Sequence, residues 1–333
     1  MNIQRREFIT LFGGAAAAWP VAAGAQQAAA RMRRIGVLVG QLPSDDAEWQ
    51  ARGTAFVQGL QELRWTDGRN VRIEYRWGLG DADRLRKYAA ELVALAPDVI
   101  LAAGPPALAA LQQATRTLPI VFANVTDPVG SGYVASLARP GGNVTGFMNV
   151  EFGQSGKLME LLKQIAPRVT RVAVLRDTSA PTSIGQLGAI QAVAPSFGVE
   201  LTPIGYRDAD EIERGIAAFV RGPSDGVIVT QGAPQQIQRD TIIALAARHR
   251  LPAVYPSRAF VTEGGLLSYS PYQADLYRKA ASYVDRILKG EKPADLPVQA
   301  PVKYETVLNM KTAKALGIDV PAQVLVRADE VIE

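Results

Sequence analysis

The sequence predicts an α/β protein made of two similar lobes, each with a parallel sheet covered by helices. Short apolar runs of strand length alternate with amphipathic stretches of helical length, as in parallel sheets with helices on both faces. Three strand motifs also recur in the same order about 130 residues further along the chain. These motifs are residues 33–39, 97–101 and 118–121, echoed at 170–176, 224–229 and 251–254. The chain of 333 residues is too long for one ordinary core and suits two domains.

The first lobe is predicted to begin with five strands and the helices between them. Residues 35–39, 99–103 and 118–122 are almost wholly apolar, which is typical of strands buried on both faces. Residues 71–77 alternate apolar and polar side chains, which indicates a strand nearer an edge. The other predicted elements of this part are a strand at 143–147 and helices at 49–63, 83–95 and 107–115.

The second lobe repeats the pattern and is followed by late elements that both lobes must share. After Arg258 we expect a strand at 264–269, a long helix at 271–288, an extended stretch at 298–308 and a short helix at 312–316. The chain must then cross between the lobes more than once, which predicts a hinge of several strands. We therefore expect two Rossmann-like lobes with parallel sheets. Their predicted ranges are 31–150 plus 264–298 for lobe 1, and 151–263 plus 299–333 for lobe 2.

The first 25 residues read as a targeting segment. Arg5 and Arg6 form a twin-arginine pattern, residues 11–23 are mildly apolar, and residues 23–25 (Ala-Gly-Ala) are a small-residue cleavage site. We expect a twin-arginine signal peptide at 1–25 and export of the mature chain to the periplasm. No other apolar run is long enough to span a membrane, so we expect no membrane-spanning segment.

A polar loop after the strand at 118–122 is the first candidate for binding. Ligands of parallel sheets bind beyond the carboxyl ends of the strands, where this chain places Asn124, Thr126 and Asp127. The local alternative is that Asp127 only caps a turn before Pro128.

Several classes of function find no support in the composition. The net charge is +4 and the arginines are scattered among acids, which does not indicate nucleic-acid binding. The chain has no cysteine and a single histidine, His249, so a thiol nucleophile and a histidine-rich metal site are excluded. No Gly-x-Ser-x-Gly elbow, phosphate loop or dinucleotide fingerprint occurs, and we expect no cofactor. An enzyme using carboxylates such as Asp127 and Asp177, as a hydrolase or isomerase, is the remaining catalytic hypothesis.

Several motifs together resemble one family. They are residues 119–122, Thr126-Asp127-Pro128, Arg139 to Gly146, residues 287–299 and residues 328–332. With these motifs the mature chain resembles the periplasmic substrate-binding proteins of ABC transporters, in the tryptophan-binding branch of the type I periplasmic binding proteins. The resemblance implies a two-lobed fold with three hinge crossings that closes on a small molecule. It also implies an ABC permease and ATPase as partners, no catalysis by this subunit, and a monomer.

The resemblance, together with the polar strand ends, gives the expected ligand contacts. Arg258 is expected to clamp a carboxylate, or alternatively to form a surface ion pair. Tyr255, Tyr269 or Tyr272 is expected to stack on a ring, or alternatively to pack in the hinge. The full set of expected ligand-binding residues is Gln41, Gly104, Pro105, Asn124, Thr126, Asp127, Asp177, Gln231, Tyr255, Arg258 and Tyr269. An amino acid or an aromatic carboxylate is the expected solute, and a ligand-sensing module for a membrane receptor is the alternative function.

Overall fold

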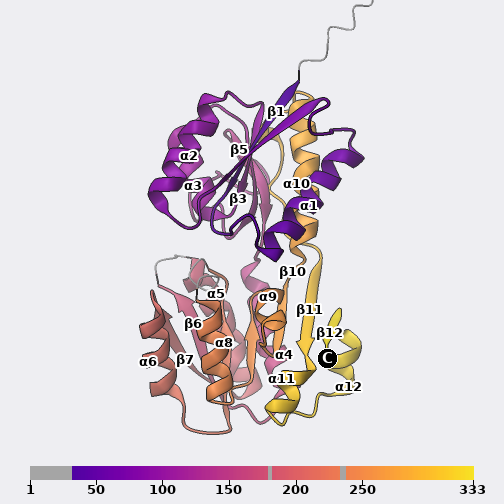
Figure 1. The fold of residues 1–333 in the computed structure, drawn as a ribbon. Helices are drawn as coiled ribbons and strands as arrows, with labels where there is room; N and C mark the ends of the chain where they lie inside the picture. The colour runs from indigo at the N-terminus through magenta and orange to yellow at the C-terminus, as the bar shows by residue number, and fades with distance from the viewer. Residues whose placement is uncertain (1–31, 179–181, 233–237) are drawn as a thin grey trace, which may run out of the picture.

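The computed structural model describes residues 32–178, 182–232 and 238–333, which form two α/β lobes joined by a hinge (Figure 1). The signal peptide expected at 1–25 lies outside these residues. Within the described ranges, no helix is long and apolar enough to cross a membrane.

Lobe 1 is a five-stranded parallel sheet in the order β2-β1-β3-β4-β5. Its strands are β1 (Arg33–Val39), β2 (Val71–Trp77), β3 (Val99–Ala103), β4 (Ile120–Val125) and β5 (Val144–Met148). Its helices are α1 (Ala47–Glu62), α2 (Ala82–Ala94), α3 (Pro105–Ala114) and α10 (Gln273–Leu288). The apolar cores show that α1 and α10 cover one face of the sheet, and that α2 and α3 cover the other.

Lobe 2 contains a seven-stranded sheet in the order β12-β11-β10-β9-β8-β6-β7. Its strands are β6 (Arg171–Asp177), β7 (Glu200–Tyr206), β8 (Asp225–Val229), β9 (Ala253–Tyr255), β10 (Leu267–Pro271), β11 (Tyr304–Asn309) and β12 (Glu330–Ile332). Its helices are α4 (Ser155–Ile165), α5 (Thr182–Val193), α6 (Ala209–Phe219), α8 (Arg239–Arg248), α9 (Arg258–Thr262), α11 (Met310–Ala315) and α12 (Ala322–Arg327). Helices α6, α8 and α9 pack on one face, whereas α4, α5, α11 and α12 pack on the other.

The two lobes share one strand order, as the repeated motifs predicted. Strands β7-β6-β8-β9-β10 are arranged like β2-β1-β3-β4-β5, which is a doubly wound order. Strand β10 is therefore the fifth strand of lobe 2, and it pairs in parallel with β9. This corrects the sequence assignment of 264–298 to lobe 1, because Leu267–Pro271 belong to lobe 2. The assignment failed because the sheet that this strand joins is decided by its pairing with β9 and β11 and not by its own residues.

Three segments of chain join the lobes. The first follows β5, the second leads from β10 into α10, and the third leads from the end of α10 back to β11. The third segment runs beside the first, since Met148 N–H donates to Gln299 O at 2.9 Å and Gln299 N–H donates to Gly146 O at 2.9 Å. Strand β11 then pairs antiparallel with β10, so the second and third crossings continue into one two-stranded ribbon.

Helix α10 is held in lobe 1 by its contact with α1. The Cα of Gly59 lies so close to α10 that a Cβ there would be 2.9 Å from Ala281 Cβ. Trp65 Nε1 donates to Asp285 Oδ1 at 2.8 Å just beyond the end of α1. Segments more than 200 residues apart thus form one layer, in which α1 and α10 lie side by side (Figure 1).

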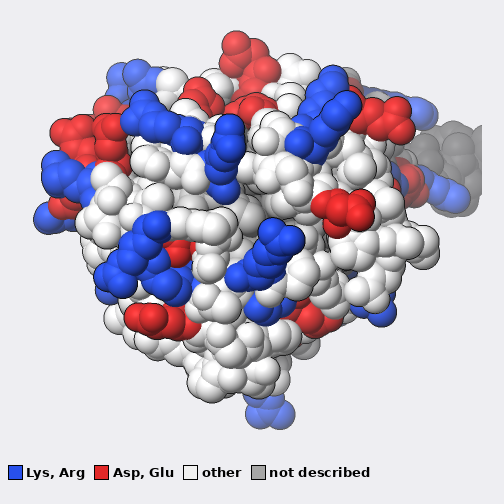
Figure 2. Space-filling model, turned by 90° about the horizontal axis from the view of Figure 1, so that it is seen from below, with Lys and Arg blue, Asp and Glu red and all other residues white. Residues whose placement is uncertain are grey.

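The surface charges are mixed. Seen from below lobe 2, Lys and Arg side chains are interspersed with Asp and Glu, and no region of a single sign covers this face (Figure 2). This agrees with the scattered arginines of the sequence and with a solvated surface.

Candidate ligand-binding cleft

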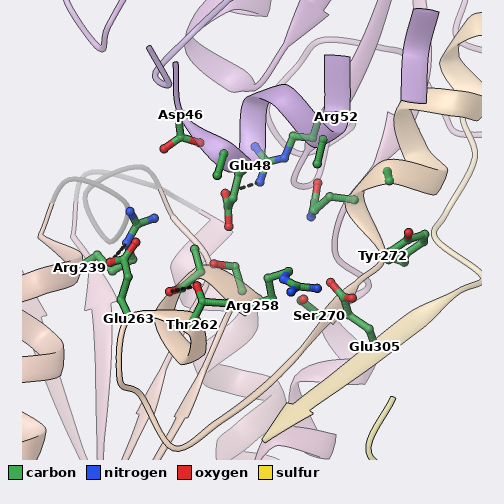
Figure 3. Close-up of a pocket in the computed structure, with 16 residues that line it drawn as sticks. Asp46, Glu48, Arg52, Arg239, Arg258, Thr262, Glu263, Ser270, Tyr272 and Glu305 are labelled. Carbon is green, nitrogen blue, oxygen red and sulfur yellow. Dashed lines mark hydrogen bonds and ion pairs between the residues drawn. The ribbon is translucent and has the colours of Figure 1, made fainter. Parts of the chain in front are cut away.

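A cavity of about 530 Å³ lies between the lobes. The first turns of α1 form its upper wall, α9 and its neighbours form its lower wall, and the β10–β11 ribbon with the start of α10 closes its back (Figure 3). Its lining residues are Asp46, Ala47, Glu48, Ala51, Arg52, Arg239, Ser257, Arg258, Ala259, Thr262, Glu263, Ser270, Tyr272, Gln273, Ala274 and Glu305. Both lobes therefore contribute charged side chains to one cleft.

The upper wall carries a buried arginine. Asp46 caps α1 by accepting a hydrogen bond of 3.0 Å from Trp49 N–H, and the helix then places Glu48 and Arg52 one turn apart. Arg52 Nη2 lies 2.7 Å from Glu48 Oε2, and the residue is only 4% exposed. Its Nε has no hydrogen-bond partner among the described residues. A buried guanidinium with an unused donor beside a cavity can bind an anionic group of a ligand.

Two ion pairs stand on the lower wall. Arg239 Nε lies 2.6 Å from Glu263 Oε2, and Arg258 makes a two-point contact with Glu330 at 2.6 and 2.8 Å. Arg258 lines the cleft as expected, but its guanidinium is already bound by a carboxylate of β12. The contacts of Arg258 therefore match the alternative of a surface ion pair, in which both side chains stay partly exposed.

Paired residues of the β10–β11 ribbon, called the hinge ribbon below, form the back of the cleft. Ser270 of β10 is directly opposite Glu305 of β11 in the antiparallel register. Burial raises the pKa of Glu305 to about 7, and Glu330, Asp329 and Glu48 add to the rise while Arg258 opposes it. A carboxylate in this position changes its charge near neutral pH.

A hydrogen-bond network joins several of the expected ligand contacts to each other. Thr126 Oγ1 donates to Asn149 Oδ1 at 2.8 Å, and Asn149 Nδ2 donates to Asn124 Oδ1 at 2.7 Å and to Gln231 Oε1 at 3.1 Å. Gln231 in turn donates to Pro256 O at 3.0 Å. Asn124 and Gln231 also line a small cavity of about 20 Å³ that shares Arg52 with the main cleft. The network thus lies at the inner end of the cleft.

Asp127 is engaged in its own turn. Its Oδ1 accepts a hydrogen bond of 2.8 Å from Gly130 N–H, and its φ of +42° belongs to the left-handed region that aspartate tolerates in turns. This geometry matches the alternative in which Asp127 caps a turn before Pro128. Asp177 is buried at the end of β6, where burial and then the charge of Asp177 raise the pKa of Tyr206.

Gln41, Gly104 and Pro105 follow the ends of β1 and β3, at the point where the strand order of lobe 1 reverses. Gly40 N–H donates to Ala103 O at 3.0 Å, so the two strand ends lie together. Gly104 has a φ of +92° and starts α3, with Pro105 as its first residue. Gln41 is partly exposed. None of the three lines the cavity described above.

The two tyrosines lie outside the main cavity. Tyr255 is 1% exposed and stacks on Phe260 with ring centroids 5.0 Å apart, and burial raises its pKa. Its ring belongs to the core of lobe 2 and is not available to a solute, which corrects the expected stacking role. Tyr269 stacks on Tyr304 at 5.1 Å and lines a separate cavity of about 30 Å³. The stacking of Tyr269 on Tyr304 matches the alternative in which this tyrosine packs in the hinge.

Arg52, Ser270 and Glu305 line the cleft but were not among the contacts expected from the sequence. Arg52 had a signal, because it interrupts the apolar stripe of α1 formed by Trp49, Phe56 and Leu60. A charged residue on the buried face of a helix needs a partner or a ligand. Ser270 and Glu305 had no comparable signal, since only the pairing of β10 with β11 brings them together.

Comparisons with known proteins agree on one family. A family model described as "ABC transporter substrate binding protein" matches residues 36–332. The chain is 27% identical over 269 residues to a tyrosine-binding protein of Clostridioides difficile, covering 79% of this chain and 75% of the relative.

Solved structures give the same picture. An ABC domain from Streptococcus pneumonia in complex with L-Trp has 29% identity and a TM-score of 0.82, covering 90% of this chain and 99% of that one. A ligand-free, open substrate binding protein with adhesive properties from Clostridium difficile has 26% identity and a TM-score of 0.72, with the same coverage.

Proposed function

The chain belongs to the family of ABC transporter substrate binding proteins, and on this premise we propose that it is the periplasmic solute-binding subunit of an ABC importer. It binds a small organic solute, an amino acid or an aromatic carboxylate, in the cleft between its lobes. It delivers that solute to a membrane permease driven by an ATPase and carries out no chemistry itself.

The charge pattern of the cleft is the observation that carries this proposal. The cavity of about 530 Å³ falls within the usual range for small-molecule sites. It is lined by charged groups of both signs, namely Arg52, Arg239 and Arg258 together with Asp46, Glu48, Glu263 and Glu305. A zwitterion offers one group of each sign and therefore suits such a cleft better than a sugar or a hydrocarbon does.

The relatives support an amino acid, and one side chain supports an aromatic one. Of the relatives described above, one is a tyrosine-binding protein and another was solved in complex with L-Trp. In this chain Tyr272 lines the cleft at the start of α10 and is 36% exposed, with Lys303 Nζ 4.5 Å from its ring centre. A half-exposed ring at the rim of the cavity can stack on the ring of a solute.

The two carboxylates named in the catalytic hypothesis do not line the cleft. Asp127 accepts a hydrogen bond within its own turn, and Asp177 is 2% exposed. A binding role requires only the charged side chains that already line the cleft.

Thermal unfolding of the mature protein tests the proposal. The chain from Gln26 onward is melted alone and with each of the twenty L-amino acids, a set of aromatic carboxylates and a set of small amides. A ligand that binds only the folded protein raises the melting temperature. At a ligand concentration a hundredfold above Kd, the free energy of unfolding rises by about 2.7 kcal/mol. Titration calorimetry then measures Kd for each hit.

Two results separate a specific site from a general effect. A Glu213→Gln variant, which changes an exposed pair with Arg248 far from the cleft, should keep the affinity of the unmodified protein. If no compound raises the melting temperature and calorimetry detects no heat of binding, an amino acid or aromatic carboxylate is not the solute and the proposal fails.

A further inference from the structure

The hinge ribbon presents different chemistry on its two faces. Side chains alternate along a strand, so Ser270 and Glu305 point to one face of β10–β11 while Tyr269 and Tyr304 point to the other. The first pair lines the main cleft, and the second lines the small cavity behind it. Residues directly opposite in an antiparallel pair have Cβ atoms about 5 Å apart, so one group of a ligand can touch both Ser270 and Glu305.

Ser270 is a buried hydroxyl without a partner. The residue is 1% exposed, its Oγ makes no hydrogen bond among the described residues, and it lines the cleft. Leaving a buried hydroxyl unpaired costs free energy, which a ligand group bonded to it would recover. Ser268, two residues earlier on the same strand, is equally buried and unpaired but does not line the cleft.

Glu305 is a carboxylate that no cation neutralises directly. Among the described residues, no salt bridge or side-chain hydrogen bond is made to its oxygens. The charged groups that face it are Arg258 from α9, Glu330 of β12 and the neighbouring Asp329, and Glu48 from α1. Arg258 is bound by Glu330, and Arg52 is bound by Glu48. The surroundings of Glu305 therefore carry an excess of negative charge, which a cationic group would relieve.

We propose that Ser270 and Glu305 form an ammonium-binding subsite at the back of the cleft, where the serine hydroxyl and the glutamate carboxylate accept hydrogen bonds from a primary ammonium group. This rests on the proposed function and narrows it, because it selects an α-amino acid over an aromatic carboxylate. The subsite does not involve Asp127, whose carboxylate already accepts a hydrogen bond from Gly130.

The subsite makes binding depend on pH. Glu305 attracts an ammonium group only when it is ionised, and burial holds its pKa near 7. The affinity for an amino acid should therefore rise from pH 5.5 to pH 8, by about tenfold if the ion pair contributes about 1.4 kcal/mol. A compound without the ammonium group should show no such rise.

The test compares two amino acids with analogues that lack only the ammonium group. Calorimetry at pH 8 measures Kd for L-tyrosine, L-tryptophan and the desamino carboxylate of each. Glu305→Gln should weaken amino-acid binding about tenfold, and Ser270→Ala about threefold, while both leave binding of the desamino compounds within about twofold. Ser268→Ala and Glu213→Gln are the matched controls and should bind like the unmodified protein.

The possible failures are distinguishable. If the unmodified protein binds amino acids and their desamino analogues equally, or if Glu305→Gln and Ser270→Ala bind amino acids unchanged, this inference is overturned and the proposed function stands. If neither amino acid binds, the inference is also overturned. If, in addition, no compound of the wider panel binds, the proposed function falls with it.

Discussion

The side chain of Asn149 donates a hydrogen bond of 3.1 Å to Gln231 Oε1 and so joins the first hinge crossing to the end of β8 in lobe 2. Asn149 also bonds Thr126 and Asn124 of lobe 1. Three residues that the sequence placed in the binding site are thus held by one asparagine. In this structure they act first as a link between the lobes.

Asn149→Ala should destabilise the protein by about 1–3 kcal/mol. The change leaves the buried Thr126 hydroxyl without its acceptor and removes the donor to the side-chain oxygens of Asn124 and Gln231. Urea unfolding of Asn149→Ala, of Gln231→Ala, of the double variant and of the unmodified protein measures the coupling energy between Asn149 and Gln231. A coupling energy of about 0.5 kcal/mol or more is expected, and strictly additive effects would show that the two side chains do not interact.

Arg52→Ala should abolish or strongly weaken solute binding and also reduce stability. It removes the buried guanidinium that can bind a carboxylate and leaves Glu48, which is mostly buried, without its partner. Arg52→Lys keeps the charge but not the forked geometry, so we expect affinity between those of Arg52→Ala and the unmodified protein. Arg248→Ala, which breaks an exposed pair, is the control in both unfolding and calorimetry. Unchanged affinity in Arg52→Ala would remove Arg52 from the site.

The ligand-free protein should lose stability as the pH rises towards neutrality, through Glu305. Its pKa is about 7 in the folded protein against an ordinary value of 4.5, so between these values the folded state holds a proton that the unfolded state has lost. This stabilising contribution is complete below pH 4.5 and disappears as the pH rises through 7. In Glu305→Gln, the melting temperature should therefore fall less between pH 5 and pH 8. Parallel pH profiles for the two proteins would contradict the assignment.

Gly59→Val should destabilise lobe 1 strongly, by about 1–3 kcal/mol or more. A side chain at Gly59 meets Ala281 Cβ and Arg278 O within about 3 Å and pushes α1 away from α10. Gly188→Ala is the opposite case, since nothing lies within 4 Å of its added Cβ in α5, and it should stabilise the protein by about 0.5–1 kcal/mol. Denaturant unfolding of both variants compares them. Equal stability of Gly59→Val and the unmodified protein would show that the two helices are not closely packed.

Much of the fold could be predicted because local pattern and topology agree. The strands at 71–77 and 99–103 have the expected bounds, and the other strands of lobe 1 differ by one to three residues at their ends. Parallel strands buried on both faces leave continuous apolar runs, which are readily recognised. The placement of β10 could not be predicted in this way, because its sheet is decided by contacts with β9 and β11 and not by its own residues.

The candidate site was less predictable than the fold. Polar residues of the strand-end loops were expected to contact a ligand, but such residues also form hydrogen bonds with each other, as Thr126, Asn149 and Gln231 do. Tyr255 is an example of the opposite error, since an aromatic residue at a strand end is equally suited to the core. Ser270 and Glu305 come together only through strand pairing between two crossings, which no local pattern encodes.

The position of α10 has a consequence for the order in which the molecule is assembled. The core of lobe 1 includes Leu276, Tyr277, Ala280, Ala281 and Val284 of this helix, so the sheet face that α1 packs on is only partly covered until α10 is added. A ribosome must therefore synthesise all of β6 to β10 before the lobe that it began first can complete its core. Lobe 1 is begun first but completes its core only after β6 to β10 of lobe 2 have been made. A chain interrupted before Gln273 leaves part of the apolar side of that sheet exposed to chaperones, proteases and other nascent chains.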